Sequence, residues 1–438
     1  MGTIYGNIPL SVRFGKYYNI HKKILDNFEN GSEQYKLDFQ YTKTLETLQF
    51  AYDHIPYYQK IFHEYDFKIE NFKDLTDIKK LPYLTKEIIQ KELPNLYTDK
   101  LDKISTYSTG GSSGAPMKMY APRSVSRAKE KIYTNYTFAK IGYAYRDRAI
   151  SMSARGKADE RKKRYWEYQM VDNYLLVSVN HLKKEYVPLM YNEILKYKPK
   201  IFYGFPSAIS LFVKTCKMLG IATIDNIQGI VLTSESISYE QIELIKDFFN
   251  APVLSHYGHT ERIIAGYRID KEPYHFYNSY GLTRVVDDEI IGTSFDNLVM
   301  PYINYKTKDY INGKVNCFEN TDIMRSVATI QGRIQEYVVT KDKSVIPILS
   351  IGAGHFDSYE YVEQAQFYQD TPGKIIVRIK SEQPELVESE KMVQQMQRQV
   401  KNTIDFEVEF VDKIENTSRK KRVLCIQKLD IESYRRNM

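Results

Sequence analysis

The sequence has few cysteines and no long apolar run. Its three cysteines, Cys216, Cys317 and Cys425, stand far apart and without CxxC spacing in a chain of 438 residues. This spacing argues against a disulfide framework and against a zinc site made of residues close together in the sequence. No apolar run approaches the roughly 18 residues of a membrane span, and the amino terminus lacks the apolar core of a signal peptide. These absences predict a cytoplasmic protein with no membrane span.

Charge of one sign is not in large excess. The net charge of +7 results from 62 basic and 55 acidic residues, and the basic residues are scattered along the chain. A nucleic-acid footprint is therefore not favoured, whereas an anionic small ligand is compatible with this balance. With 42% hydrophobic and 27% charged residues, the chain has the composition of a globular protein with a large core. Nothing in the composition indicates an oligomeric state.

The order of the expected elements predicts the fold class. Residues 1 to about 100 are expected to be mostly helical, and after them strands and helices alternate. The expected strands lie near 148–154, 201–204, 227–233 and 252–258, and the expected helices near 125–141, 186–196, 207–219 and 239–249. Such alternation is typical of an α/β fold with mostly parallel sheets, flanking helices and ligands near the carboxyl ends of the strands. We therefore predict a large N-terminal domain over residues 1–332.

The chain changes character after Arg333. Strand-like segments at 362–369, 374–381 and 406–414 surround a helical pattern at 386–402. This mixture predicts a small α+β C-terminal domain over residues 333–438. The basic segment 420–430 alternates like a strand, which makes nucleic-acid binding through it the least favoured function.

A glycine-rich loop, STGGSSGAP, runs from Ser108 to Pro116 between two strand-like segments. It has neither the GK[ST] ending nor the GxGxxG spacing of the common nucleotide loops, and a strand follows it where both of those require a helix. Its glycines allow backbone N–H groups to converge on a phosphate, and Thr109, Ser112 and Ser113 can add hydroxyl donors. The residues alone leave a phosphate-binding nest and a plain hairpin equally open.

A second motif, PVLSHYGHTER, places Tyr257, Gly258, Thr260 and Glu261 just past an expected strand. An aromatic face can stack on a base, a hydroxyl can contact a phosphate, and a carboxylate can hold Mg²⁺. The plain alternative is a surface turn.

Further polar residues accompany this motif. His256 and His259 flank its tyrosine and are expected to be pocket wall or polar loop residues rather than catalysts. INYKTKDYI sets Asp309 after an expected strand, where it can accept from two ribose hydroxyls or serve as an ordinary turn residue. IQGRIQEYV then places Arg333 at the expected domain junction.

The order of these motifs resembles that of a known enzyme family. TGGSSGAP, Thr109 to Pro116, is similar to the TSGTTGxP loop of the adenylate-forming enzymes, the acyl-CoA synthetase superfamily. YGHTE, YKTKD, QGR and TSRKKR follow in that family's order, and the likeness extends from about residue 80 to the carboxyl terminus. The branch that the sequence resembles most contains the phenylacetate-CoA ligases and the capsule-biosynthesis adenylate formers.

The resemblance implies a role for each matching residue. The loop would hold the ATP phosphates, Tyr257 would stack on adenine, Thr260 would contact the α-phosphate, Glu261 would bind Mg²⁺, and Asp309 with Arg333 would hold the ribose. The remaining implied site residues are Thr109, Gly111, Ser112, Ser113 and Gly114 in the loop, Gly258, Glu235 near the adenine, and Lys421 as the adenylating lysine. A helix cap explains Glu235 and its neighbours equally well.

Four positions depart from the family pattern. Gly110 and Ala115 replace a Ser and a Lys of the loop, and Lys308 and Lys420 replace two glycines. The departure at Lys420 leaves it open whether Lys420 or Lys421 is the adenylating lysine.

The implied activity is ATP-dependent activation of a small carboxylic or amino acid as an acyl adenylate, with release of pyrophosphate. The acyl group would then pass to CoA or to an amine or hydroxyl of a sugar precursor, in surface polysaccharide biosynthesis, and the C-terminal domain would rotate as a mobile lid near Gln335. The alternatives are a degenerate protein that binds nucleotide and acid without full turnover, and a direct amide ligase acting on a sugar precursor.

Overall fold

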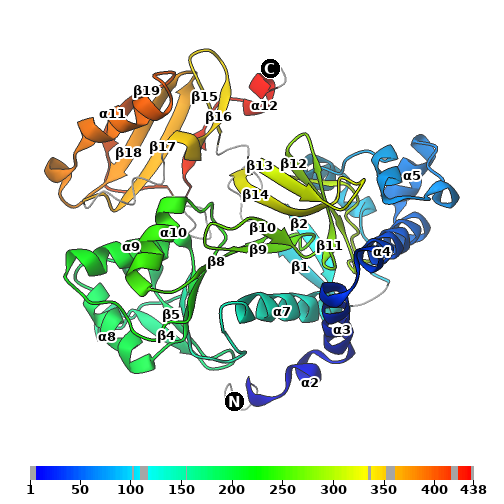
Figure 1. The fold of residues 1–438 in the computed structure, drawn as a ribbon, viewed down its shortest axis with the longest axis horizontal. Coiled ribbons are helices and arrows are strands. Elements are labelled where there is room, and N and C mark those ends of the chain that lie inside the picture. Colours follow the sequence, from blue (N-terminus) through cyan, green and yellow to red (C-terminus); the bar gives the residue numbers. More distant parts are fainter. Residues whose placement is uncertain are drawn as a thin grey trace. The chain divides into compact units, whose positions relative to one another are not determined.

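The computed structural model describes residues 6–100, 103–108, 117–153, 155–333, 337–351, 361–415 and 423–435. The chain forms two compact units, and Figure 1 shows the course of the chain through its elements. Unit 1 comprises Met1–Lys140 and His256–Ile330, and unit 2 comprises Ile141–Ser255 and Gln331–Met438. Within the described residues, no helix is both long and apolar enough to cross a bilayer.

The first hundred residues of unit 1 are mainly helical, as the sequence predicts. The helices are α2 (Leu10–Phe14), α3 (Lys16–Asn30), α4 (Glu33–His54), α5 (Pro56–Glu64) and α6 (Lys86–Glu92). Side-chain oxygens cap two of them: Ser32 Oγ accepts from the third residue of α4 at 3.2 Å, and Thr85 Oγ1 from that of α6 at 3.3 Å. These caps satisfy backbone N–H groups that a helix leaves unpaired at its start.

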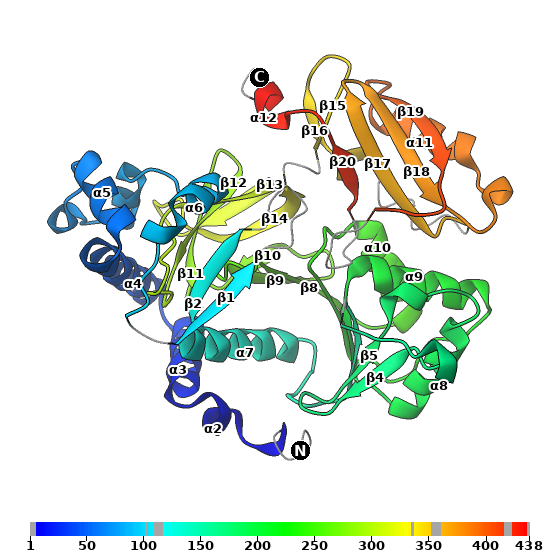
Figure 2. The same ribbon diagram turned by 180° about the vertical axis from the view of Figure 1, so that it is seen from behind.

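A hairpin and an antiparallel sheet region complete unit 1. The strands β1 (Ile104–Ser108) and β2 (Lys118–Pro122) pair antiparallel, with Ser108 opposite Lys118, and α7 (Arg123–Ala139) follows directly and lies alongside β2 (Figure 2). The other strands are paired in the order β11-β12-β13-β14-β10-β9. Their bounds are β9 (Ala265–Ile269), β10 (Tyr274–Phe276), β11 (Gly281–Val286), β12 (Glu289–Ser294), β13 (Tyr305–Cys317) and β14 (Met324–Arg333).

Unit 2 contains the predicted alternation of strands and helices. Its strands β3 (Ala149–Met152), β4 (Trp166–Gln169), β5 (Tyr174–Val177), β6 (Ile201–Gly204) and β7 (Gly229–Thr233) run in the order β7-β6-β3-β5-β4. The helices α8 (Val187–Tyr197) and α9 (Pro206–Met218) lie between these strands in the chain, and α10 (Tyr239–Phe249) follows β7. All neighbouring pairs from β7 to β5 are parallel, and only the edge strand β4 is antiparallel.

The predicted α/β fold class is confirmed, although the large sheet is mixed. Within the described residues it has twelve strands, and the division between the two units falls within β8 (Val253–Gly258). The parallel pairs come from the segment whose alternation predicts them. Apart from the pair of β4 with β5, the antiparallel pairs with a described register come from residues 265–333, for which the sequence patterns predict no pairing.

The C-terminal part of unit 2 is an α+β region. The strands β17 (Gln364–Thr371), β18 (Lys374–Lys380), β19 (Asp405–Phe410) and β20 (Cys425–Gln427) form a sheet in the order β19-β18-β17-β20, and α11 (Ser389–Gln399) packs on β19 (Figure 1). A short hairpin of β15 (Tyr337–Val339) and β16 (Val345–Pro347) and the helix α12 (Ile431–Arg435) accompany it. The region has a core of its own, which includes Phe367, Val377 and Met392. Residues 1–332 and 333–438 remain the predicted domains.

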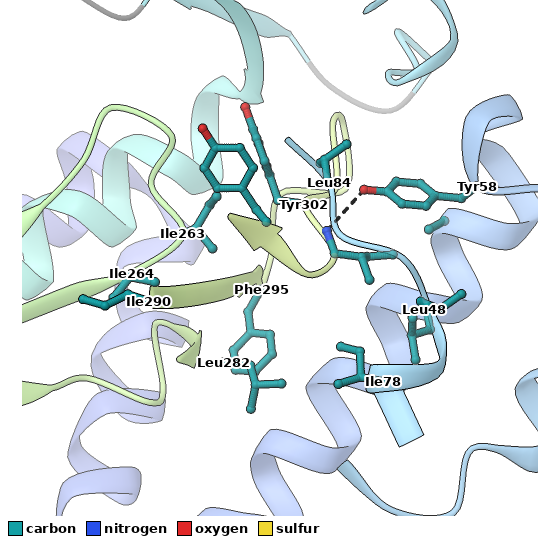
Figure 3. Close-up of a cluster of buried hydrophobic side chains, with 14 of the residues drawn as sticks. Leu48, Tyr58, Ile78, Leu84, Ile263, Ile264, Leu282, Ile290, Phe295 and Tyr302 are labelled. Atoms are coloured by element: carbon teal, nitrogen blue, oxygen red, sulfur yellow. Dashed lines mark hydrogen bonds between the residues drawn. The ribbon is translucent and has the colours of Figure 1, made fainter. Parts of the chain in front are cut away.

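The largest core of unit 1 lies where the N-terminal helices meet the antiparallel strands. Figure 3 shows Leu48 and Ile78 from the helical region beside Leu282 and Phe295 from the sheet region. Full burial of such a side chain stabilises the fold by about 1.5–3 kcal/mol. The Tyr58 hydroxyl accepts from the backbone N–H of residue 303 at 3.2 Å and donates to the carbonyl of residue 301 at 2.9 Å, so its burial leaves no unpaired polar atom.

A buried ionic cluster lies in unit 1 beside α7. Lys129 Nζ donates to Asp296 Oδ2 at 3.1 Å and to two backbone carbonyls at 2.6 and 3.1 Å. Lys43 Nζ lies 3.5 Å and His21 Nδ1 3.9 Å from the Asp296 carboxylate. Burial raises the pKa of Asp296, but Lys129, His21 and Lys43 outweigh it and lower the pKa to about 2. The sequence patterns predict no such cluster.

Candidate active site

The site motif YGHTE begins at the end of β8 and continues into a tight turn. Tyr257 and Gly258 are the last two residues of β8, and Thr260 and Glu261 follow in the turn, which the N–H of Arg262 closes by donating to the carbonyl of His259 at 3.1 Å. The expected strand at 252–258 is present as β8 and ends at Gly258, so Tyr257 and Gly258 belong to the strand and only Thr260 and Glu261 lie past it.

Tyr257 and Asp309 are in direct contact. The Tyr257 hydroxyl donates to Asp309 Oδ2 at 2.7 Å, although 52 positions separate the two residues in the chain. Asp309 is 7% exposed, and its backbone N–H donates to Thr307 Oγ1 at 3.1 Å. The structure thus brings together the two residues for which the resemblance implies contacts to adenine and ribose.

Asp309 lies within β13, so the prediction that it follows a strand is wrong. The pairing with β12 shifts register here: Ile291 is opposite Lys306, whereas Glu289 is opposite Tyr310. Lys308 takes up the extra length with a left-handed φ of 61°, and its N–H donates to Glu289 Oε1 at 2.9 Å. A bulge of this kind bends a strand without ending it, and a lysine at the bulge gives no sign of it in the sequence.

Glu261 is buried with one oxygen unpaired. Its side chain is 6% exposed, and Oε1 accepts from the Tyr305 hydroxyl at 3.2 Å. Among the described residues, Oε2 has no hydrogen-bond partner, and the His259 ring nitrogen Nδ1 is 3.7 Å from it. Buried carboxylate oxygens are normally paired, and a hard cation such as Mg²⁺ prefers oxygen ligands. The residue therefore fits the predicted metal ligand.

The donor set around Glu261 is small. In the part of the chain that the structure describes, no three His, Cys, Asp or Glu side chains gather closely enough to hold a metal ion. A single carboxylate suits Mg²⁺ bound mainly through the phosphates of a nucleotide, since Mg²⁺ commonly takes one or two protein carboxylates with phosphate and water. It does not suit a structural zinc site.

Gly258 has open space around it. Among the described residues, a Cβ added there would meet only His256 Cε1 at 3.5 Å and the carbonyl oxygen of Ile264 at 3.7 Å, which are ordinary contacts. Packing against these residues therefore does not require glycine at this exposed position. Close approach of a ligand to the backbone is a requirement that a glycine can meet.

The predicted strand–loop–strand arrangement around the glycine-rich loop is present. β1 ends at Ser108 and β2 begins at Lys118, and the two strands pair antiparallel. The implied site residues of the loop, Thr109, Gly111, Ser112, Ser113 and Gly114, lie outside the described residues.

Arg262 connects the YGHTE turn to this hairpin, and sequence reasoning missed it. Its guanidinium lies 4.3 Å from the centroid of the Tyr107 ring on β1, and Nη1 donates to Ser126 Oγ in the first turn of α7. A cation over an aromatic face and a charge-assisted hydrogen bond both restrain the turn. Nothing in the sequence around Arg262 indicates that its side chain links the turn to β1 and α7.

Three predicted site residues belong to unit 2. Glu235 accepts at 3.0 Å from both the backbone N–H and the hydroxyl of Ser207, at the start of α9. The cap of α10 is Ser238, whose side chain forms a capping box with Gln241. Arg333 ends β14, but its side chain is outside the described parts, and Lys421 lies outside the described residues. Their implied roles stay predictions.

Burial shifts two pKa values near the site. It lowers the pKa of His256, against the opposing charge of Glu130. It raises the pKa of Glu289, although the Lys308 N–H and the Lys306 ammonium both stabilise the carboxylate. The Glu289 carboxylate thus holds the backbone of the bulge through its bond to the Lys308 N–H.

Comparisons with known proteins extend these observations. No family model matches the chain. The protein CapK of Staphylococcus aureus is 22% identical over 457 residues, covering 98% of this chain and 96% of that protein. The crystal structure of 2-hydroxyisobutyryl-CoA ligase in the postadenylation state has a TM-score of 0.66 at 14% identity, covering 91% of this chain and 90% of that one. Its complex with an acyl-AMP and CoA in the thioesterification state gives 0.54 at 12% identity, covering 94% of each chain.

Proposed function

We propose that this chain, which has the fold of acyl-CoA ligases whose structures contain acyl adenylates, activates a small carboxylic acid with ATP. A carboxylate is a poor acyl donor because its leaving group would be an oxide. Attack of one carboxylate oxygen on the α-phosphate of ATP breaks the bond to the β-phosphate, releases pyrophosphate and leaves a mixed anhydride with AMP. Such chemistry depends mainly on positioning and charge stabilisation, so it needs no protein nucleophile.

The contact between Tyr257 and Asp309 carries this proposal. The Tyr257 hydroxyl donates to Asp309 Oδ2 at 2.7 Å, which orients an aromatic ring and a buried carboxylate toward each other. The resemblance of the YGHTE and YKTKD motifs to those of the family implies that Tyr257 contacts adenine and that Asp309 contacts the ribose. A nucleoside needs both an apolar face for its base and an acceptor for its ribose hydroxyls, and this pair supplies both.

Glu261 would hold Mg²⁺ in this proposal. Its Oε2 is buried and unpaired among the described residues, which fits a carboxylate whose partner is a cation. When bound, Mg²⁺ supplies positive charge next to the phosphates as pyrophosphate leaves. Thr260, which precedes Glu261 in the turn, would donate its hydroxyl to the α-phosphate.

We propose CoA as the acceptor of the acyl group. The two structures compared above are states of one CoA ligase that each match more than 90% of this chain, and one of them contains both an acyl-AMP and CoA. The reaction would take place in the cytoplasm.

A second acceptor is an amine or hydroxyl of a sugar precursor for a surface polysaccharide. The likeness to CapK over nearly the full length of both chains supports this candidate, as does the motif resemblance to capsule-biosynthesis adenylate formers. The two candidates share the adenylation step and differ only in the nucleophile that attacks the acyl carbon.

The test is exchange of labelled pyrophosphate into ATP with a panel of carboxylic and amino acids and Mg²⁺. We expect acid-dependent exchange with at least one acid, and then AMP release that depends on CoA. Tight ATP binding with no exchange for any acid would support the degenerate binding protein. Exchange that CoA does not convert into a thioester would support the sugar-precursor acceptor, which candidate amines and sugars would then identify.

A further inference from the structure

His259 is a buried histidine whose ring nitrogens are both unpaired among the described residues. Its side chain is 6% exposed, and neither Nδ1 nor Nε2 has a hydrogen-bond partner. The distance from Nδ1 to Glu261 Oε2 is 3.7 Å, which is too long for a hydrogen bond. The Tyr257 ring meets the imidazole edge-on at a centroid distance of 6.0 Å, and this contact pairs neither nitrogen.

Structural histidines are normally paired. In unit 2, Ser178 Oγ lies 2.9 Å from Nδ1 of His181, and Glu160 Oε1 lies 3.2 Å from Nε2 of the same ring. A neutral imidazole has one N–H donor and one nitrogen acceptor, and burial of both without partners destabilises a fold. Such an exception in a native protein calls for an explanation, and a ligand that supplies the missing partner is one.

The position of His259 restricts which part of a bound ligand can pair with its ring nitrogens. The residue lies in the same turn as Thr260 and Glu261 and directly precedes the threonine that would contact the α-phosphate. In an acyl adenylate, one oxygen joins the acyl carbon to that phosphate. Because the Cα atoms of adjacent residues are only about 3.8 Å apart, the His259 side chain is within reach of the first carbons of the acyl group.

We propose that His259 is a specificity-determining residue that recognises a hydroxyl group close to the carboxyl group of the acid substrate. This inference rests on the proposed function, because it needs an acid to be held next to the α-phosphate. A hydroxyl both donates and accepts, so it can pair with either ring nitrogen. A second carboxylate would lie near Glu261 and be repelled by it, and an alkyl group would leave both nitrogens unpaired.

The experiment compares stable sulfamoyl analogues of acyl adenylates in matched pairs. Lactoyl- and propionyl-sulfamoyladenosine differ by one hydroxyl, as do the 3-hydroxybutyryl and butyryl analogues. Their dissociation constants are measured by calorimetry for the wild type, for His259→Leu, and for His259→Gln, which keeps a donor and an acceptor. His275→Leu on β10 is the control, because it removes an exposed histidine of the same unit.

We expect the wild type to bind the hydroxyacyl member of at least one pair about tenfold more tightly or better, since a site built around a hydroxyl rejects analogues that lack it. His259→Leu should abolish this preference without weakening ATP binding, and His275→Leu should retain it. His259→Leu should also raise the midpoint of thermal unfolding, because it removes unpaired buried nitrogens. A histidine with a purely structural role would lower the midpoint when replaced.

Three results would overturn the inference. They are equal binding within both pairs by the wild type, an unchanged preference in His259→Leu, and no binding of any acyl analogue. The first two leave the proposed function intact if acid-dependent pyrophosphate exchange is observed. Absence of exchange with every acid overturns the proposed function instead, and the analogue preference remains measurable because it does not require turnover.

Discussion

Asp309 makes a contact within the protein and is also the residue that we propose binds the ribose. One oxygen, Oδ2, accepts from Tyr257, while the carboxylate as a whole is 7% exposed at the bulge of β13. A carboxylate has about four lone-pair sites, of which the bond to Tyr257 uses one. The tyrosine contact restricts the rotation of the carboxylate, which lowers the entropy lost when a ribose binds.

Replacement of Asp309 tests this role. Asp309→Ala should weaken ATP affinity by about 1–3 kcal/mol, because ribose hydroxyls would lose their acceptor in a buried place. Tyr257→Phe should cost about 1 kcal/mol or less, since the ring stays and only the orienting bond is lost. Calorimetric titration with ATP and Mg²⁺ measures both, with the exposed Asp412→Ala as the control. Unchanged affinity in a folded Asp309→Ala protein would show that the ribose is bound elsewhere.

The bulge in β13 is the element that places Asp309. Lys308 adopts φ 61°, a conformation that costs a residue with a Cβ about 1–2 kcal/mol relative to right-handed backbone. Its ammonium lies 3.1 Å from Glu87 Oε1, but Glu87 is 62% exposed, so this ion pair contributes about 1 kcal/mol at most. The family pattern has glycine at this position, which the left-handed φ explains.

Substitutions at Lys308 should therefore have opposite effects. Lys308→Gly should raise the free energy of unfolding by up to about 1 kcal/mol, because glycine tolerates this φ, whereas Lys308→Val should lower it by about 1 kcal/mol or more. Unfolding midpoints in urea measure the difference in stability. The Glu87→Gln variant measures how much of that difference comes from losing the ion pair between Lys308 and Glu87. Equal stability of the glycine and valine variants would contradict a left-handed residue at this position.

The elements differ in how well the sequence predicts them. Periodic apolar positions predict α4, α9 and α10 and the parallel strands between the helices, because burial on one face leaves a regular pattern. The antiparallel strands β9 to β14 escape prediction, since their pairing depends on register and on a bulge at a lysine, which local patterns do not encode. Motif order predicts the proximity of Tyr257 and Asp309, but not the Tyr305 bond to Glu261 or the unpaired nitrogens of His259, because both follow from the way distant segments pack.

At the scale of the whole molecule, the ionic cluster around Asp296 makes stability depend on pH. Burial lowers the pKa of His21 from 6.5 to about 4, with Asp296 opposing this shift. Between these values the unfolded chain binds a proton that the folded chain does not, so stability is lost as pH falls from 6.5 toward 4. Asp296, with a pKa of about 2 instead of 3.8, contributes stability that is lost only as pH falls through those lower values.

We therefore expect His21→Asn to reduce the acid sensitivity of the protein. The wild type should lose about 2 kcal/mol from this group between pH 7 and pH 5, and the variant should lack that loss because asparagine does not titrate. Thermal unfolding at both pH values measures the change, with the exposed His63→Asn as the matched control. A variant with the same pH dependence as the wild type would show that folding does not lower the pKa of His21.

The C-terminal region has the independent core that a moving lid requires. Phe367, Val377 and Met392 are buried within it, so this region can keep its structure through a rotation. We propose that it closes during adenylation and brings a lysine to the carboxylate and the α-phosphate. A flexible ammonium contacts these oxygens most strongly as charge moves in the transition state, so its removal should affect turnover more than ATP binding.

Lys421→Ala tests two points: that the C-terminal region supplies a lysine for adenylation, and that this lysine is Lys421 rather than Lys420. We expect acid-dependent pyrophosphate exchange to slow by at least about a hundredfold, or roughly 3 kcal/mol, with little change in ATP affinity. A chemically supplied acyl adenylate should still be consumed with the true acceptor, because that half-reaction does not need the adenylating lysine. Lys420→Ala should be mild, since adjacent residues of a strand-like segment face opposite sides. Loss of exchange in Lys420→Ala alone would move the assignment by one residue, and full exchange in both variants would remove the lysine from the mechanism.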